Sequence, residues 1–126
     1  MNNRHGNYIA TVSGNIISVT MLGAFNIDGV KACIKDVQLI INNLGDNSFY
    51  LMSNILQFSG ATPDAYDEIN KFNCWLRKQN VVALAVVNAS SAILSIFSMR
   101  IASAKHKKIQ IFTNEFDAIN WLKEQK

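Results

Sequence analysis

Residues 81–87 have the sequence VVALAVV, a run of apolar residues with no polar position on either face. A strand that meets water on one side alternates apolar and polar side chains, so this run predicts a strand that is covered on both faces inside a sheet. The run is far shorter than the ~20 residues that span a bilayer. We therefore expect no membrane-spanning segment.

Helical patterns lie on both sides of this strand. Upstream, residues 62–64 (TPD) are typical of a helix start, because Thr can cap, Pro fits the first position and Asp favours the positive end of the helix dipole. Downstream, residues 88–91 (NASS) offer several caps for a third helix that continues to about Ala104. Strands joined through helices of this length pair in parallel with right-handed crossovers.

The remaining segments complete an α/β domain. Residues 8–22 predict an opening hairpin with its turn at 13–15 (SGN). Apolar positions at helical spacing from 30 to 44 predict the first helix, which we expect to start near Asn26 or Asp28. Residues 49–52 predict a short buried strand, 108–112 an alternating strand, and 113–122 a last helix. The expected order is ββαβαβαβα, a mostly parallel five-stranded sheet with an N-terminal hairpin and four helices. We expect one domain over residues 1–126, with residues 1–6 disordered.

Composition narrows the classes of function. Apolar residues make up 49% of the chain and charged residues 17%, and the net charge is +3. Part of that charge comes from the cluster 105–108 (KHKK), which lacks interleaved aromatic residues and so disfavours nucleic-acid binding. Cys33 and Cys74 fall in helical patterns, which predicts free thiols rather than a disulfide. No export signal follows Met1, and we expect a cytoplasmic protein.

The residues that catalysis requires are scarce. The histidines are His5, near the terminus, and His106, inside the lysine cluster, so neither is placed to activate a nucleophile. Cysteines and histidines occur singly along the chain, which excludes the paired spacing of a zinc site. Glycine-rich phosphate loops are also missing, so we expect neither a metal nor a cofactor. The acidic residues Asp64, Asp67 and Glu68 fit the exposed start of a helix better than an acid–base pair.

Three stretches carry a family resemblance. The buried strand ends in VVN at 86–88, the last strand ends in IF at 111–112, and the last helix contains FDAINWL at 116–122. Together with the order of elements, these resemble the SpoIIAA-like group of the STAS superfamily. The resemblance implies a regulatory or ligand-sensing domain rather than an enzyme. Members of the anti-sigma-antagonist type carry an Asp-Ser-Ser-Gly turn before the second helix, where a serine is phosphorylated, whereas the corresponding loop here, residues 57–60, reads QFSG.

The receptive surface is expected at the carboxyl edge of the sheet, where ligands of open α/β sheets usually bind. We expect the starts of the second and third helices to meet there, with unpaired N–H groups suited to a phosphate, a carboxylate or a phosphoserine. The alternative is that these hydroxyls only cap their helices. The residues of this predicted site are Phe58, Ser59, Gly60, Thr62, Tyr66, Asn88, Ser90 and Ser91. An apolar pocket beside it could be lined by Phe58, Tyr66, Trp75 and Phe97, or these aromatics could simply be core.

Three hypotheses about function follow. The first is a non-enzymatic regulatory module that binds a protein partner or a small apolar or anionic ligand at this edge. The second is a phosphorylation switch at Ser59. The third is a homodimeric assembly role for the hairpin face or an exposed helix side.

Overall fold

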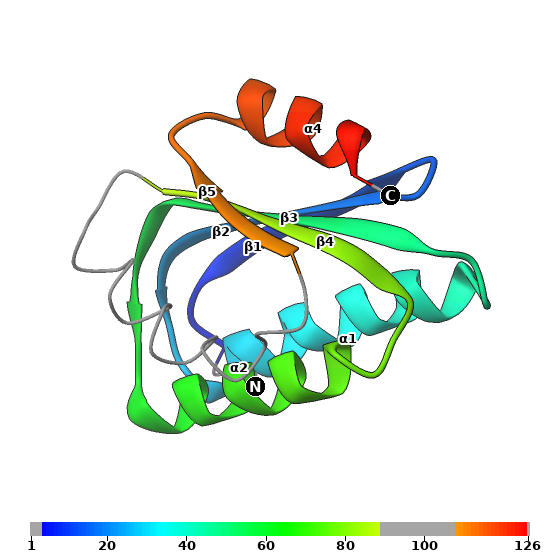
Figure 1. The fold of residues 1–126 in the computed structure, drawn as a ribbon. Helices are drawn as coiled ribbons and strands as arrows, with labels where there is room; N and C mark the ends of the chain where they lie inside the picture. Colours follow the sequence, from blue (N-terminus) through cyan, green and yellow to red (C-terminus); the bar gives the residue numbers. More distant parts are fainter. Residues whose placement is uncertain (1–3, 89–107, 126) are drawn as a thin grey trace.

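A computed structural model describes residues 4–88 and 108–125, which form a three-layer arrangement around one sheet (Figure 1). Helix α4 covers one face of the sheet, and α1 and α2 cover the other. The elements are β1 (Asn7–Ser13), β2 (Ile16–Phe25), α1 (Ile27–Asn43), β3 (Phe49–Ala61), α2 (Pro63–Leu76), β4 (Val81–Val87), β5 (Lys108–Phe112) and α4 (Glu115–Glu124). The described residues thus contain three helices, and the predicted third helix at 88–104 falls almost wholly outside them.

The five strands form one mixed sheet in the order β1-β2-β3-β4-β5. The predicted hairpin is confirmed, since β1 and β2 pair antiparallel up to Ser13 and Ile16. The β2–β3, β3–β4 and β4–β5 pairs are parallel. The apolar run at 81–87 forms β4, which lies inside the sheet between β3 and β5, as its lack of a polar face predicted.

β3 is much longer than the sequence predicted. We expected a strand over 49–52 and a loop at 57–60, but the strand continues to Ala61. The reason is tertiary, because β2 is also long and pairs with β3 as far as Phe25 and Ala61, with irregular register near Gly23. This pairing outweighs the turn preference of the polar residues and glycine at 57–60. Figure 1 shows this end of the two strands bending toward α1 and α2.

Each face of the sheet has its own core. On the α1 and α2 side, nearly inaccessible side chains come from β2, β3 and both helices: Ile17, Val19, Cys33, Val37, Ile41, Leu51, Ile55, Phe58, Ala65 and Leu76. On the α4 side they are Met52, Ala83, Ala85, Val87, Ala118 and Leu122. Each large aliphatic side chain in these sets contributes about 1.5–3 kcal/mol on burial. β4 contributes to both cores, with Val81 and Val86 on the α1 and α2 side and Ala83, Ala85 and Val87 on the α4 side.

The segment before β1 is attached to the start of α1. Asn26 caps α1, and its Oδ1 accepts hydrogen bonds from the backbone N–H of Gly29 and of His5, each at 2.9 Å. The His5 carbonyl lies so close to Gly29 that a Cβ there would be 1.9 Å from its oxygen, which explains a glycine in the first turn of a helix. His5 and Gly6, which we expected to be disordered, are therefore held against α1.

We predict that Asn26→Ala lowers the free energy of unfolding by about 1–2 kcal/mol, because one oxygen satisfies two backbone donors. Asn42→Ala, on the exposed side of the same helix, is the control and should change stability by only a few tenths of a kcal/mol. Urea denaturation followed by circular dichroism measures both. Equal losses in the two variants would contradict the role assigned to Asn26.

Candidate functional site

Ser59, Gly60 and Thr62 lie where β3 ends and α2 begins. Ser59 and Thr62 are exposed, while Gly60 is partly covered and pairs with Ala24 of β2. Thr62 occupies the N-cap position of α2, but its side chain makes no capping bond to the helix backbone. Its hydroxyl donates instead to the carboxylate of Asp64. The expectation that the hydroxyl caps the helix is therefore wrong for Thr62.

Aromatic side chains pack beneath the junction between β3 and α2, which we call the β3–α2 corner. Phe58 is only 3% exposed, and its ring lies 5.8 Å from that of Phe25 and 6.4 Å from that of Tyr66, in an edge-to-face contact with the latter. A hydrogen bond also holds the backbone in place, since the N–H of Thr62 donates to the carbonyl of Phe25 at 3.1 Å. Phe58 is thus part of the core that holds the corner and not a wall of an open pocket, whereas Tyr66 is half-buried beside it.

The other half of the predicted site begins at Asn88, which directly follows β4. Asn88 is buried, and its N–H donates to the carbonyl of Phe112 at 2.9 Å. Its neighbour Val87 pairs with Asn54 of β3, whereas Gly60 lies much further along that strand. The strand register therefore does not set Asn88 beside Ser59 and Thr62. Ser90 and Ser91, like Phe97 and His106, lie outside the described residues, and their part in the site stays a prediction.

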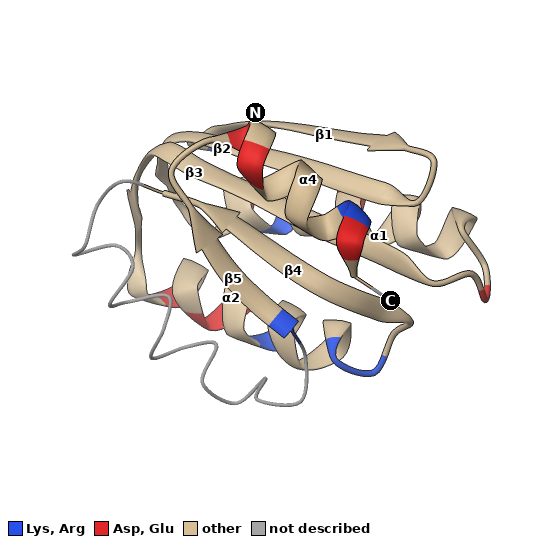
Figure 2. Cartoon of the chain, turned by 45° about the horizontal axis from the view of Figure 1, so that its top comes forward, with Lys and Arg blue, Asp and Glu red and all other residues tan. Residues whose placement is uncertain are grey.

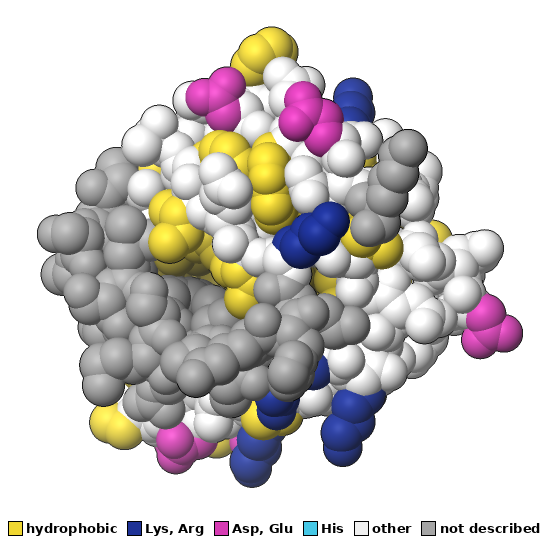
Figure 3. All heavy atoms as spheres, in the orientation of Figure 1, with side chains coloured by type: hydrophobic (Ala, Val, Ile, Leu, Met, Phe, Trp, Pro, Cys, Tyr) yellow, Lys and Arg dark blue, Asp and Glu magenta, His cyan; other side chains and the backbone are white. Residues whose placement is uncertain are grey.

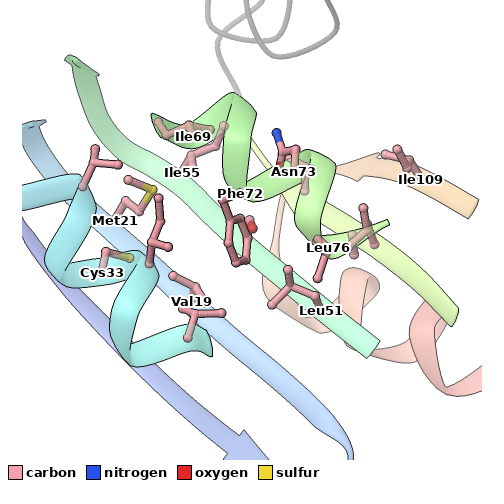
Figure 4. Close-up of a pocket in the computed structure, with 17 residues that line it drawn as sticks. Val19, Met21, Cys33, Leu51, Ile55, Ile69, Phe72, Asn73, Leu76 and Ile109 are labelled. Atoms are coloured by element: carbon pink, nitrogen blue, oxygen red, sulfur yellow. The ribbon is translucent and has the colours of Figure 1, made fainter. Parts of the chain in front are cut away.

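An apolar cavity lies deeper, between α1, α2 and the sheet (Figure 4). Its volume is about 80 Å³. An engineered apolar cavity of about 150 Å³ binds benzene or xenon, so the space here suits only a very small apolar molecule unless its walls move. The lining includes Val19, Val37, Leu51, Ile55, Ile69, Phe72, Asn73 and Leu76.

The aromatic residue of this cavity is not one that the sequence predicted. Phe58, Tyr66 and Trp75 do not line it, and Phe72 does. Trp75 instead packs against Phe72, with the ring centres 5.7 Å apart. Phe72 lies on one side of α2 with Ile69 and Leu76, and this helical spacing was the available signal. It could equally indicate ordinary core, because spacing identifies the buried side of a helix but not a gap in its packing.

Cys33 is the titratable group of the cavity wall. Burial raises the pKa of the Cys33 thiol to about 12, and the nearby negative charge of Asp36 acts in the same direction. The thiol is therefore protonated at neutral pH and is a poor nucleophile. Both Cys33 and Cys74 are free, as predicted, with Cys33 buried and Cys74 partly exposed.

Potential metal ligands do not gather within residues 4–88 and 108–125. No group of three or more potential metal ligands occurs there. Figure 2 shows lysine, arginine and acidic residues spread over several elements, and Figure 3 shows no continuous basic patch among the described side chains of that face. In this part of the chain, no helix has the length and hydropathy to cross a membrane.

The comparisons with known proteins identify the fold. No protein-family model matches the sequence, and no curated protein does. Among solved structures, an uncharacterised DUF3478 protein of Shewanella loihica PV-4 with a SpoIIAA-like fold matches with a TM-score of 0.67 and 15% identity, over 97% of each chain. The unphosphorylated anti-sigma factor antagonist SpoIIAA matches with a TM-score of 0.63 and 10% identity, over 94% of this chain and 99% of its own. A structure of Mglu matches 66% of this chain and 20% of its own, with 12% identity and a TM-score of 0.52.

The chain therefore has a SpoIIAA-like fold. The resemblance inferred from the strand and helix patterns is confirmed at the level of the fold. Sequence identities of 10–15% support a shared fold but do not allow functional residues to be transferred to this chain.

We predict that xenon enters the cavity between α1 and α2. Under xenon pressure, the methyl NMR signals of Val19, Leu51 and Ile55 should shift, and the methyl signals of Val87 and Leu122, which belong to the α4 side, should not. Val37→Ile adds a methyl group to the cavity wall and should reduce the shifts. Equal shifts on both sides of the sheet would mean that xenon does not report this cavity.

Proposed function

We propose that this chain is a non-enzymatic regulatory domain that binds a protein partner through the corner where β3 meets α2. We call this surface the rim and define it as Leu56–Asp64. The observation that carries the proposal is a set of exposed groups on an ordered backbone: the Ser59 and Thr62 hydroxyls, and Leu56 with 44% of its surface exposed. One similar fold belongs to an anti-sigma factor antagonist, whose action is on another protein.

The rim has the properties of a preformed recognition surface. Its backbone is fixed by pairing with β2 and by the buried Phe58, so little conformational entropy is lost when a partner binds. Leu56 offers apolar area, and the exposed Ser59 hydroxyl can donate and accept hydrogen bonds at little desolvation cost. The Thr62 hydroxyl, which donates to Asp64, can accept one. This combination suits a protein surface better than it suits a reaction, which would need a positioned acid, base or nucleophile.

We predict that Ser59→Arg weakens partner binding about tenfold or more, because a long charged side chain prevents close approach at the rim. The control is Asn42→Arg, which makes the same charge change on the exposed side of α1. Each protein would be cross-linked in its native cell and the captured proteins quantified by mass spectrometry. A rim partner is captured by the wild type and by Asn42→Arg but lost with Ser59→Arg. If no captured protein shows this pattern, the rim is not the binding surface.

Phosphorylation of Ser59 is a second mechanism by which the rim could regulate binding of a partner. The Ser59 hydroxyl is exposed, and a phosphate there would add about −1.5 to −2 charges close to the acidic start of α2. The residue lies within a strand rather than at the helix terminus, so the helix dipole would give this phosphate little stabilisation. The effect we propose is therefore repulsion of a partner and not ordering of the rim.

For this alternative we expect Ser59→Asp to reduce capture of the rim partner while Ser59→Ala retains it. Intact-mass analysis of the protein from its native cell should also show a singly phosphorylated form that is missing from Ser59→Ala. A wild-type protein that carries no phosphate under any growth condition would eliminate the switch and leave the binding role standing.

A small apolar ligand is the other candidate, and the cavity beneath α2 is the observation that favours it. The lining is almost entirely apolar, with Asn73 and Ser53 as its polar members, which is the usual composition of small-molecule sites. Its volume limits the ligand to a few heavy atoms. Assembly of two copies is compatible with either kind of binding.

A further inference from the structure

The sheet face that carries α4 is only half covered. Helix α4 packs on β3 and β4 through Ala118 and Leu122, and the hairpin β1–β2 extends to one side of it (Figure 2). A groove of about 500 Å³ lies between the helix and the hairpin. Its lining comes from the hairpin, β3 and one side of α4: Ile9, Thr11, Ser18, Thr20, Met52, Glu115, Phe116, Ile119, Asn120 and Lys123.

The floor of the groove is uncharged, and exposed apolar side chains lie at its borders. The hairpin contributes three hydroxyl residues and Ile9, which is 56% exposed. Phe116 stands at the border with 75% of its surface exposed, the largest exposed fraction among the large hydrophobic residues of the described chain. Figure 3 shows hydrophobic side chains exposed among the charged ones over α4. Solvent exposure of a large aromatic beside an uncharged groove is typical of an interaction surface.

Opposite charges lie at the two ends of the helix side that borders the groove. Glu115 is at the start of α4 and Lys123 is in its last turn. Neither makes an ion pair with another described residue in the single chain. When two such helices lie side by side in opposite directions, each Glu115 meets the Lys123 of the other helix. A twofold axis produces this arrangement twice, because it makes the same patch complementary to itself.

We propose that the groove is occupied by a second copy of this chain, in a twofold dimer in which Phe116 of each copy enters the groove of the other. The antiparallel α4 helices then cover the half of each sheet face that one helix leaves open, as α1 and α2 together cover the opposite face. Glu115 pairs with Lys123 of the second copy at both ends of the contact. The proposal does not depend on partner binding at the rim, which belongs to the β3–α2 corner.

A second copy fits this surface better than an unrelated partner for two reasons. The surface supplies both the projecting aromatic and the groove that receives it, which is the requirement of an isologous contact. Its charges are also balanced, with one acidic and one basic residue at opposite ends, whereas a surface adapted to an acidic or basic partner would carry one sign.

Sedimentation equilibrium over a range of concentrations tests the proposal on the full chain. The wild type should show a monomer–dimer equilibrium, and Phe116→Asp should raise the dissociation constant of the dimer about thirtyfold or more. The matched control is Leu39→Asp, which places the same charge at an exposed position of α1 outside the groove and should dimerise as the wild type does. Circular dichroism confirms that each variant is folded.

Exchanging the charges of Glu115 and Lys123 distinguishes this dimer from dimers that use other contacts. Glu115→Lys should raise the dissociation constant about tenfold, since each dimer exchanges two attractive contacts for two repulsive ones. The double variant Glu115→Lys with Lys123→Glu should restore it, because the twofold contact is regenerated with the signs reversed. A wild type that stays monomeric at millimolar concentration overturns the proposal and leaves the groove to a different protein. A dimer that is indifferent to Phe116→Asp, such as one paired through the edge strand β1, also overturns it.

Discussion

Strands β2 and β3 are hydrogen-bonded in parallel from Ile16 and Tyr50 to Phe25 and Ala61, well beyond the ends of β4 and β5. Most of the remaining architecture depends on this pairing. A parallel pair cannot be closed by a tight turn, so α1 must cross between the two strands and its apolar side must lie on their common face. The added length of both strands then carries the chain past the main body of the sheet and fixes where α2 begins.

The two faces of the sheet are closed in different ways. Two helices cover one face and leave a small cavity between them, because Phe72 and the aliphatic residues around it do not fill the space completely. A single helix covers part of the other face and leaves a groove beside the hairpin. Among the described residues, the sheet thus has an apolar cavity on one side and an open groove with an uncharged floor on the other.

The pKa values of two described residues are raised by their surroundings. The pKa of Cys33 is raised by burial, and the pKa of Tyr8 is raised to about 12, chiefly by its hydrogen bond to Asp36. Both shifts keep the group protonated at neutral pH, which is the opposite of what an activated nucleophile requires. Asp64 accepts a hydrogen bond from Thr62, and Glu68 pairs with Lys71 at 3.3 Å. These acidic groups therefore have structural roles at the start and along the side of α2.

The sequence by itself determined the opening hairpin and the interior position of β4, because turn residues and hydrophobic periodicity are local signals. The SpoIIAA-like fold was inferred from a family resemblance, which the similar structures confirm at the level of the fold. The sequence also placed helix starts near Asn26, Thr62 and Asn114, although it could not tell that the Thr62 hydroxyl would bond to a carboxylate. The prediction placed residues 57–60 in a loop, whereas they belong to β3. Only the tertiary structure decided that point, since the length of β3 depends on its pairing with a strand more than thirty residues earlier. The cavity and the groove were equally inaccessible to sequence reasoning, because a gap in packing depends on how elements meet and not on which residues each one buries.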